Sequence, residues 1–440
     1  MRRRTHGVVL VVLVLALLLP TSGVLGKREP ELPFALTGDI NGAAFIIRVP
    51  ENWNGSLLLY ARGYSPSPVT NPDVAFPGSP ADDGDTTEEL LLANGYALAA
   101  SGFRNAGWNI EEAIQDMQQL LVFFRRTVAH PKRVLIYGGS MGGVVALKSM
   151  EMYHGLYDGA VPICTAAMGS TRNADLKLDY TVAYAAAFGW DPSWGDIGDL
   201  PDGEAGFTVY EQVMSHFSGN LVQLANPAVF ARFEFMRLVN DMPLGAFYPP
   251  TVAPMPGPGV ALNMMLGYYL RYELEARAGG PAAQNADHVY SLTDADRARL
   301  SMLGMTDTEM DDLLAKMNAM ANIEAQRSAR QYLERFDVSG LIKAPVLMLH
   351  NIEDPLAIVE STQAYYETVA ARGREDLLVR VYTDRPGHCN VTPDQVLALF
   401  QAMDSWLDTG AVPGAEALPA DLGFDLDFEP DPWPQPPTGD

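Results

Sequence analysis

The sequence predicts an α/β protein whose mostly parallel sheet is covered by helices on both faces. Continuous apolar runs typical of buried strands occur at 43–49, 56–61, 96–100, 133–137, 159–163, 345–350 and 378–382. Helical periodicity at 110–128 and 144–153 separates several of these runs. Such strands alternating with helices are typical of a parallel sheet that is buried on both sides. The pair Asn54-Gly55 after the first run predicts a hairpin-type turn.

The amino-acid composition excludes several classes of function. The chain has 440 residues, of which 48% are apolar, so it can bury a large core. A net charge of −24 argues against nucleic acid and anionic lipid as partners, and makes a strongly anionic substrate less expected. Two cysteines are too few for a disulfide scaffold or a Cys-based zinc site. No motif suggests a metal or an organic cofactor, and none is expected.

The amino terminus has the pattern of a secretory signal peptide. Three arginines precede an apolar run at 8–19, and small residues follow it. Cleavage is expected after Gly26, or alternatively after Gly23. An uncleaved membrane anchor is the competing interpretation, but the run is shorter than the ~20 residues that span a bilayer. We therefore expect a secreted or periplasmic protein with no stable membrane insertion after removal of residues 1–26.

Residues 165–342 break the alternation of strands and helices. They contain no convincing strand, a capping box at Thr306 and Glu309, and a weaker one at Thr293 and Asp296. The segment holds twelve of the nineteen methionines together with many aromatic residues. These side chains form either a helical core or, in part, the lining of an adaptable apolar pocket. A Pro-rich stretch at 248–258 is expected to be a loop between helical halves.

The sequence changes character again after residue 410. The last thirty residues contain seven acids, seven prolines and no Lys or Arg, so they are expected to bury little and to form a mobile tail. The predicted organisation is a signal peptide at 1–26, a core at 27–164 and 343–410, a helical lid at 165–342, and an acidic Pro-rich tail at 411–440.

The strongest motif is Gly138-Gly139-Ser140-Met141-Gly142, which fits G-x-S-x-G between a predicted strand and a predicted helix. A sharp strand-to-helix turn exposes the serine hydroxyl, and glycine flanks tolerate the close backbone approach. The amide of Met141 lies at the helix amino terminus, where it can stabilise an oxyanion. Ser140 is therefore the predicted nucleophile.

A serine nucleophile needs a base and an acid that orients the base. Only one of the seven histidines, His388, lies in a loop after the last strand; a lone loop histidine is otherwise usually a surface residue. The acid should follow the preceding strand, where Asp354 is preferred over its neighbour Glu353 and over Asp384. The resulting chain order Ser, Asp, His is the one that this motif requires.

The loop Arg62-Gly63-Tyr64-Ser65-Pro66 follows the strand at 56–61. This loop should supply the second oxyanion donor, and we nominate the backbone amide of Tyr64.

These motifs resemble those of the α/β-hydrolase superfamily, in particular its secreted bacterial serine esterases and related peptidases with large lids. The resemblance covers 34–163 and 343–409. It implies the α/β-hydrolase fold, with an eight-stranded, mostly parallel sheet, hydrolysis through an acyl-enzyme, and a lid inserted after the sixth strand. Many relatives have His where this chain has Arg62, which could alter the charge of the pocket.

The two cysteines fit a bridge near the base. Cys164 ends a predicted strand and Cys389 adjoins His388, so both should lie at the carboxyl edge of the sheet. In an oxidising compartment they could form a disulfide; two buried free thiols are the alternative. Tannase-like esterases resemble this in tying the base's loop through a neighbouring cysteine, but theirs pairs with a cysteine beside the nucleophile, where this chain has Gly139.

The expected activity is the hydrolysis of small-molecule or polymeric carboxylic esters by an exported serine hydrolase. A serine peptidase that removes terminal residues, with lid acids holding a peptide's amine, is the first alternative. A catalytically silent binding protein with the same fold is the second. The sequence does not address the oligomeric state.

Overall fold

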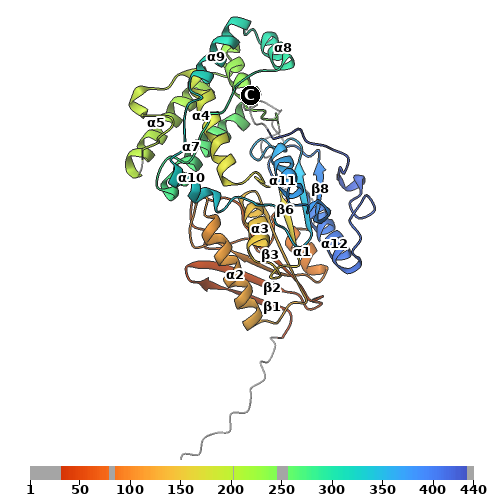
Figure 1. Cartoon of the computed structure of the whole chain (residues 1–440). Coiled ribbons are helices and arrows are strands. Elements are labelled where there is room, and N and C mark those ends of the chain that lie inside the picture. Colours follow the sequence, from red (N-terminus) through yellow and green to blue (C-terminus); the bar gives the residue numbers. More distant parts are fainter. Residues whose placement is uncertain (1–30, 79–84, 202, 245–255, 434–440) are drawn as a thin grey trace, which may run out of the picture.

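An eight-stranded sheet forms the centre of the lower body in Figure 1. The computed structural model describes residues 31–78, 85–201, 203–244 and 256–433. The strand order is β1-β2-β4-β3-β5-β6-β7-β8. The strands are β1 Phe34–Ile40, β2 Ala43–Val49, β3 Ser56–Ala61, β4 Ala97–Ser101, β5 Arg133–Gly139, β6 Gly159–Ile163, β7 Val346–Asn351 and β8 Leu378–Thr383.

The sheet is mostly parallel, as the sequence predicted. Strand β2 pairs antiparallel with β1 and with β4, and every pairing from β4 through β8 is parallel. Strands β3, β4, β6 and β7 are buried along their whole length, which explains their continuous apolar sequence. Alternate side chains of β3 enter opposite cores: Leu57 and Leu59 on one face, Leu58 and Tyr60 on the other.

Helices cover both faces of the sheet. The core on the first face includes side chains of α2 (Ile110–Thr127), α3 (Met141–Met152) and α11 (Glu360–Ala370). The core on the second face includes side chains of α1 (Thr87–Ala93) and α12 (Pro393–Thr409). The helix α12 begins with the capping box of Thr392 and Gln395, with Pro393 in its first turn. These layers keep the loops at the carboxyl edge of the parallel strands in fixed positions.

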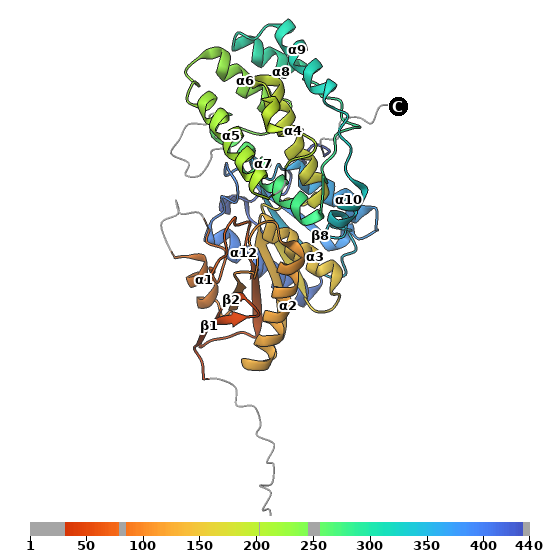
Figure 2. The same ribbon diagram turned by 90° about the vertical axis from the view of Figure 1, so that its left-hand side faces the viewer.

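A helical insertion follows β6 and precedes β7, and Figures 1 and 2 show it gathered above the sheet. Both predicted capping boxes are present, at Thr293 and at Thr306. The helix α4 packs against α6, α7, α9 and α10, so it is the central helix of the insertion. The helices are α4 Ser170–Phe188, α5 Gly203–Leu221, α6 Pro227–Leu238, α7 Pro256–Ala278, α8 Asp294–Met302, α9 Asp307–Ala319 and α10 Arg327–Glu334.

Two local predictions were wrong. Asn54-Gly55 does not close a hairpin, because β2 and β3 lie on either side of β4 and do not pair with each other. The carboxyl-terminal segment buries more than expected: Leu418 is 1% and Phe424 4% exposed, and Asp425 pairs with Tyr382 of β8. Its spaced apolar residues fill the sheet's second core in spite of the surrounding acids and prolines.

The predicted signal peptide and most of the predicted loop at 248–258 lie outside the described residues. Within the described residues, no helix combines the length and apolar character that a membrane crossing requires.

Candidate active site

Ser140 stands on a strained turn between β5 and α3. Its backbone has φ 55° and ψ −124°, a conformation that costs energy for a residue with a Cβ. A Cβ added to Gly138 would lie 2.4 Å from the carbonyl oxygen of Ala61, and one added to Gly142 would lie 2.0 Å from the same oxygen. The neighbouring strand β3 therefore requires glycine at both positions. The Ser140 hydroxyl makes no capping bond to its own helix, so it stays available for chemistry.

The two nominated oxyanion donors flank this turn. Met141 is the first residue of α3, so its amide has no partner within the helix and adds to the positive end of the helix dipole. Gly63 lies against the turn, since a Cβ added to it would be 3.6 Å from Cβ of Ser140. Tyr64 follows Gly63 and lines the same cavity as Ser140. The loop nominated for the second donor thus lies beside the nucleophile.

Arg62 braces this loop. The guanidinium donates from Nε to the carbonyl of Gly102 at 2.8 Å and from Nη1 to the carbonyl of Gly63 at 2.8 Å. It also lies over the ring of Phe103, 4.7 Å from the centroid. Burial lowers the pKa of Arg62 to about 10, which leaves it charged at neutral pH. Arg62 does not line the cavity in the structure; its side chain holds backbone carbonyls instead.

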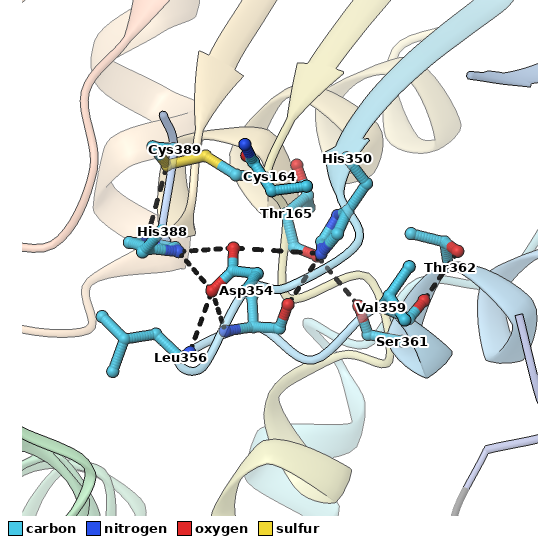
Figure 3. A network of polar contacts seen from close by, with 12 residues as sticks. Cys164, Thr165, His350, Asp354, Leu356, Val359, Ser361, Thr362, His388 and Cys389 are labelled. Carbon is cyan, nitrogen blue, oxygen red and sulfur yellow. Dashed lines mark hydrogen bonds and ion pairs between the residues drawn. A yellow bond between two sulfur atoms is a disulfide. The ribbon is translucent and has the colours of Figure 1, made fainter. Parts of the chain in front are cut away.

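His388 and Asp354 form a close pair at the ends of β8 and β7 (Figure 3). Nδ1 of His388 lies 2.8 Å from Oδ2 and 3.0 Å from Oδ1 of Asp354. Asp354 is fully buried and also accepts from the amides of Leu356 and Ala357, at 2.9 and 3.0 Å. Because Nδ1 is engaged by Asp354, Nε2 of His388, which lies 3.5 Å from Sγ of Cys389, is the nitrogen that can serve a reacting group.

The two competing acids are placed differently. Both Glu353 and Asp384 are exposed. Glu353 contributes its backbone carbonyl, which accepts from the amide of Gly387 at 2.9 Å and so holds the histidine loop. Asp354 is therefore the carboxylate that the structure brings to His388.

His350 supports the loop that carries Asp354, a role that the sequence did not reveal. The side chain is fully buried, and its Nε2 donates to the carbonyl of Ala357 at 2.7 Å. Burial lowers the pKa of His350, so the neutral ring is favoured. No sequence signal separates this histidine from any other at the end of a strand.

Cys164 and Cys389 form a disulfide, which confirms the predicted bridge. Their Cα atoms are 5.1 Å apart and their separation along the chain is 225 residues. The bridge joins the end of β6 to the residue after His388 (Figure 3). These two sulfurs and His388 are also the described group whose spacing could hold a metal ion, but sulfurs bonded to each other do not offer thiolate ligands.

A small cavity connects the predicted residues with the helical insertion. It has ≈ 50 Å³ of space for the centres of water molecules. Ser140, His388 and Tyr64 line it from the core, and Asn173, Lys177 and Leu270 line it from α4 and α7. The remaining lining residues are Trp108, Ala166, Leu356 and Ala357. Asn173 and Lys177 were not predicted from the sequence, because helical spacing in a long insertion does not show which helix face contacts the core.

The insertion also contacts the loop of the nominated oxyanion donor. The Tyr64 hydroxyl donates to Oε2 of Glu273 on α7 at 2.7 Å. Burial raises the pKa of Glu273. This contact fixes one wall of the cavity to the insertion.

The strand order, the strained serine turn and the Ser, Asp, His order are those of the α/β-hydrolase fold. The resemblance stated from the sequence is thereby confirmed at the level of the fold. No family model matches the chain. The chain is similar to the o-phthalyl amidase of Xanthobacter agilis, with 25% identity over 422 residues that cover 88% of this chain and 89% of that protein.

Solved structures with some similarity include hydrolases. An esterase from Aspergillus oryzae has 13% identity and a TM-score of 0.39, over 86% of this chain and 80% of its own. Tannin acyl hydrolase from Aspergillus niger has 12% identity and a TM-score of 0.39, over 86% and 78%. An acylaminoacyl peptidase from Pyrococcus horikoshii has 11% identity and a TM-score of 0.38, over 86% of this chain but only 42% of its own.

Proposed function

We propose that the protein is a serine hydrolase that cleaves carboxylic ester or amide bonds through an acyl-enzyme. The observation that carries the proposal is the hydrogen-bonded pair of His388 and Asp354, which opens onto the same cavity as Ser140 on its strained turn. A nucleophile, a base and an acid that orients the base are the groups that acyl transfer requires.

Each residue has a definite role in this mechanism. Ser140 Oγ attacks the acyl carbon while Nε2 of His388 takes its proton, and Asp354 stabilises the imidazolium that forms. The amides of Met141 and Tyr64 hold the oxyanion. His388 then protonates the leaving alcohol or amine. Water, activated by the same base, releases the acid and restores Ser140.

An ester is the first candidate substrate, and an amide is the second. The amide candidate is favoured by the relative from Xanthobacter agilis, whose name is that of an amidase. A peptidase that binds a free amine is less well supported. Among the residues that line the cavity no carboxylate occurs, and one of them, Lys177, is basic and would repel a substrate ammonium. A catalytically silent binding protein is less well supported, because the buried carboxylate of Asp354 orients a histidine that lines the same cavity as Ser140.

We also propose that the protein works outside the cytoplasm, after removal of residues 1–26. The basic and apolar pattern at the amino terminus supports this, and so does a disulfide, since such bonds persist in oxidising compartments.

The test compares short-chain nitrophenyl esters, acyl nitroanilides and aminoacyl nitroanilides on the mature protein. Ser140→Ala should lower kcat by about 10⁴-fold or more on any substrate that is cleaved, as loss of a triad nucleophile does elsewhere. Ser149→Ala, a buried serine further along α3, is the matched control and should retain activity. Full activity of Ser140→Ala would remove Ser140 from the mechanism.

A further inference from the structure

Lys177 is a buried cation in the cavity of the proposed nucleophile. It lies on α4, is 3% exposed, and lines the cavity together with Ser140 and His388. A buried ammonium is costly unless an anion or a set of hydrogen bonds compensates it. The neighbours of Lys177 therefore decide what this side chain can do.

The described neighbours of Lys177 compensate the charge only in part. Its Nζ donates to the amide oxygen of Asn263 at 3.0 Å, and it lies over the ring of Tyr180, 4.9 Å from the centroid. Neither group is anionic, and among the described residues no carboxylate forms an ion pair with Lys177. The negative charge of Asp354 acts to raise the pKa of Lys177 without direct contact, but Asp354 is itself hydrogen-bonded to His388. Burial lowers the pKa of Lys177 to about 7.

We propose that Lys177 binds a free carboxylate on the acyl part of the substrate. The substrates are then monoamides or monoesters of short dicarboxylic acids. This proposal rests on the proposed function, and it names the substrate class of that same site. The ammonium donates to one carboxylate oxygen, and the amide of Asn173, one turn earlier on α4 and also in the cavity, is placed to donate to the carboxylate as well.

The size of the cavity sets the length of the acyl group. Its ≈ 50 Å³ corresponds to about four waters, or roughly 120 Å³ of liquid volume, which suits an acyl chain of about four or five carbons. Ser140 and Lys177 line this one small space. The carboxylate must therefore lie within a few bonds of the scissile carbonyl.

The overall reaction is a hydrolysis in which water is the second reactant. The bond from Ser140 Oγ to the acyl carbon forms, the bond to the leaving nitrogen or oxygen breaks, and His388 carries the serine proton to the leaving group. Water then cleaves the acyl-enzyme and releases the dicarboxylic acid. The net charge of −24 disfavours a polyanion, but the charge of a single carboxylate is neutralised by the Lys177 ammonium.

The first test measures how strongly the enzyme prefers an acyl group with a free carboxylate over a neutral analogue. Glutaryl nitroanilide is compared with its neutral analogue, in which a carboxamide replaces the free carboxylate, and the ratio of kcat/KM values is taken. The wild-type ratio should exceed 10, and Lys177→Met should lower it by about 10- to 100-fold, the value of one charge-assisted hydrogen bond. Lys148→Met removes another buried lysine, which donates to the backbone of Asp337 outside the cavity, and should leave the ratio unchanged.

A wild-type ratio of one or less would overturn the proposal, and this result needs no variant to fold. An equal loss on both substrates in Lys177→Met would also overturn it, because that pattern belongs to a structural lysine.

The second test does not depend on turnover. In the Ser140→Ala background, calorimetry should detect binding of glutarate, and adding Lys177→Met should weaken that binding by at least tenfold. If glutarate binds but the wild-type protein hydrolyses none of the substrates, the role of Lys177 is supported and the proposed function is contradicted. Hydrolysis without any binding of glutarate would keep the hydrolase and overturn the carboxylate site.

Discussion

The disulfide between Cys164 and Cys389 should stabilise both the fold and the histidine loop. It closes a loop of 225 residues. The chain-entropy estimate for a loop of this length is about 5 kcal/mol at 25 °C, and measured bridges reach about that value at most. We therefore expect the double variant Cys164→Ala/Cys389→Ala to lose about 2–5 kcal/mol of unfolding free energy.

The activity of that variant should be affected less than its stability. The histidine loop keeps other anchors, because the side-chain amide of Asn351 donates to the carbonyls of Arg385 and Asn390, both at 2.9 Å. These bonds hold the loop from β7, whereas the bridge holds it from β6. We expect kcat to fall by about tenfold, since small displacements of a catalytic group are costly.

The assay is guanidinium unfolding of the oxidised wild type and of the double variant, with ester turnover measured below the transition. Both cysteines have positive φ, 43° at Cys164 and 57° at Cys389, and alanine also has a Cβ, so the exchange adds no new backbone strain. An unfolding free energy within about 0.5 kcal/mol of wild type would refute the stabilising role. Titration of two thiols in the unfolded, unreduced protein would refute the bridge itself.

Three other variants test the remaining parts of the site and its support. Asp354→Asn should lower kcat by about 10⁴-fold in stopped-flow or steady-state assays, because His388 loses the partner that fixes its tautomer; a loss under tenfold would contradict this. Tyr64→Phe should keep kcat within about tenfold, because the nominated donor is the backbone amide and, among the described residues, the hydroxyl donates to Glu273; a loss near 10³-fold would assign the hydroxyl to the oxyanion. Burial raises the folded-state pKa of Glu360 to about 7, so its ionisation lowers the unfolding free energy as pH rises from about 4.5 to 7. Glu360→Gln should therefore raise the unfolding free energy by about 3 kcal/mol at pH 8 and leave it almost unchanged at pH 4. Urea unfolding curves that are the same for variant and wild type at pH 8 would contradict this.

The sequence predicted the central sheet well because the signals were local. The strands β2, β3 and β6 have the predicted bounds, since each is a short apolar run between turn residues. The strand β1 was not predicted as a separate element: its burial pattern is that of a partly exposed edge strand, with little apolar signal. The start of α3 was placed three residues late, at Val144 in place of Met141, because Gly142 and Gly143 lower helical propensity.

The hairpin expected at Asn54-Gly55 failed for a long-range reason. A turn dipeptide reflects the local backbone only, whereas the partner of each strand is set by the whole sheet, and β4, which begins at Ala97, lies between β2 and β3. The tail was misjudged because its overall composition hides a few apolar residues, Leu418 and Phe424, that reach the core.

The placement of the candidate site residues was predictable where a motif or a strand end defined their position. Ser140 came from G-x-S-x-G, and His388 and Asp354 from their places after consecutive strands. The residues that shape the cavity were not predictable, because Lys177, Asn173 and Glu273 belong to helices whose orientation depends on tertiary packing. Their position near Ser140 and His388 follows only from the packing of the insertion on the carboxyl edge of the sheet.

The central claim is that Ser140 is the nucleophile of a hydrolase. The most direct measurement treats the folded wild-type protein with a fluorophosphonate and maps the adduct by peptide mass spectrometry. We expect one adduct per chain, on Ser140, and its formation should be slowed at least a hundredfold in Asp354→Asn. An adduct on another serine, or no adduct on a folded wild-type protein, would contradict the claim.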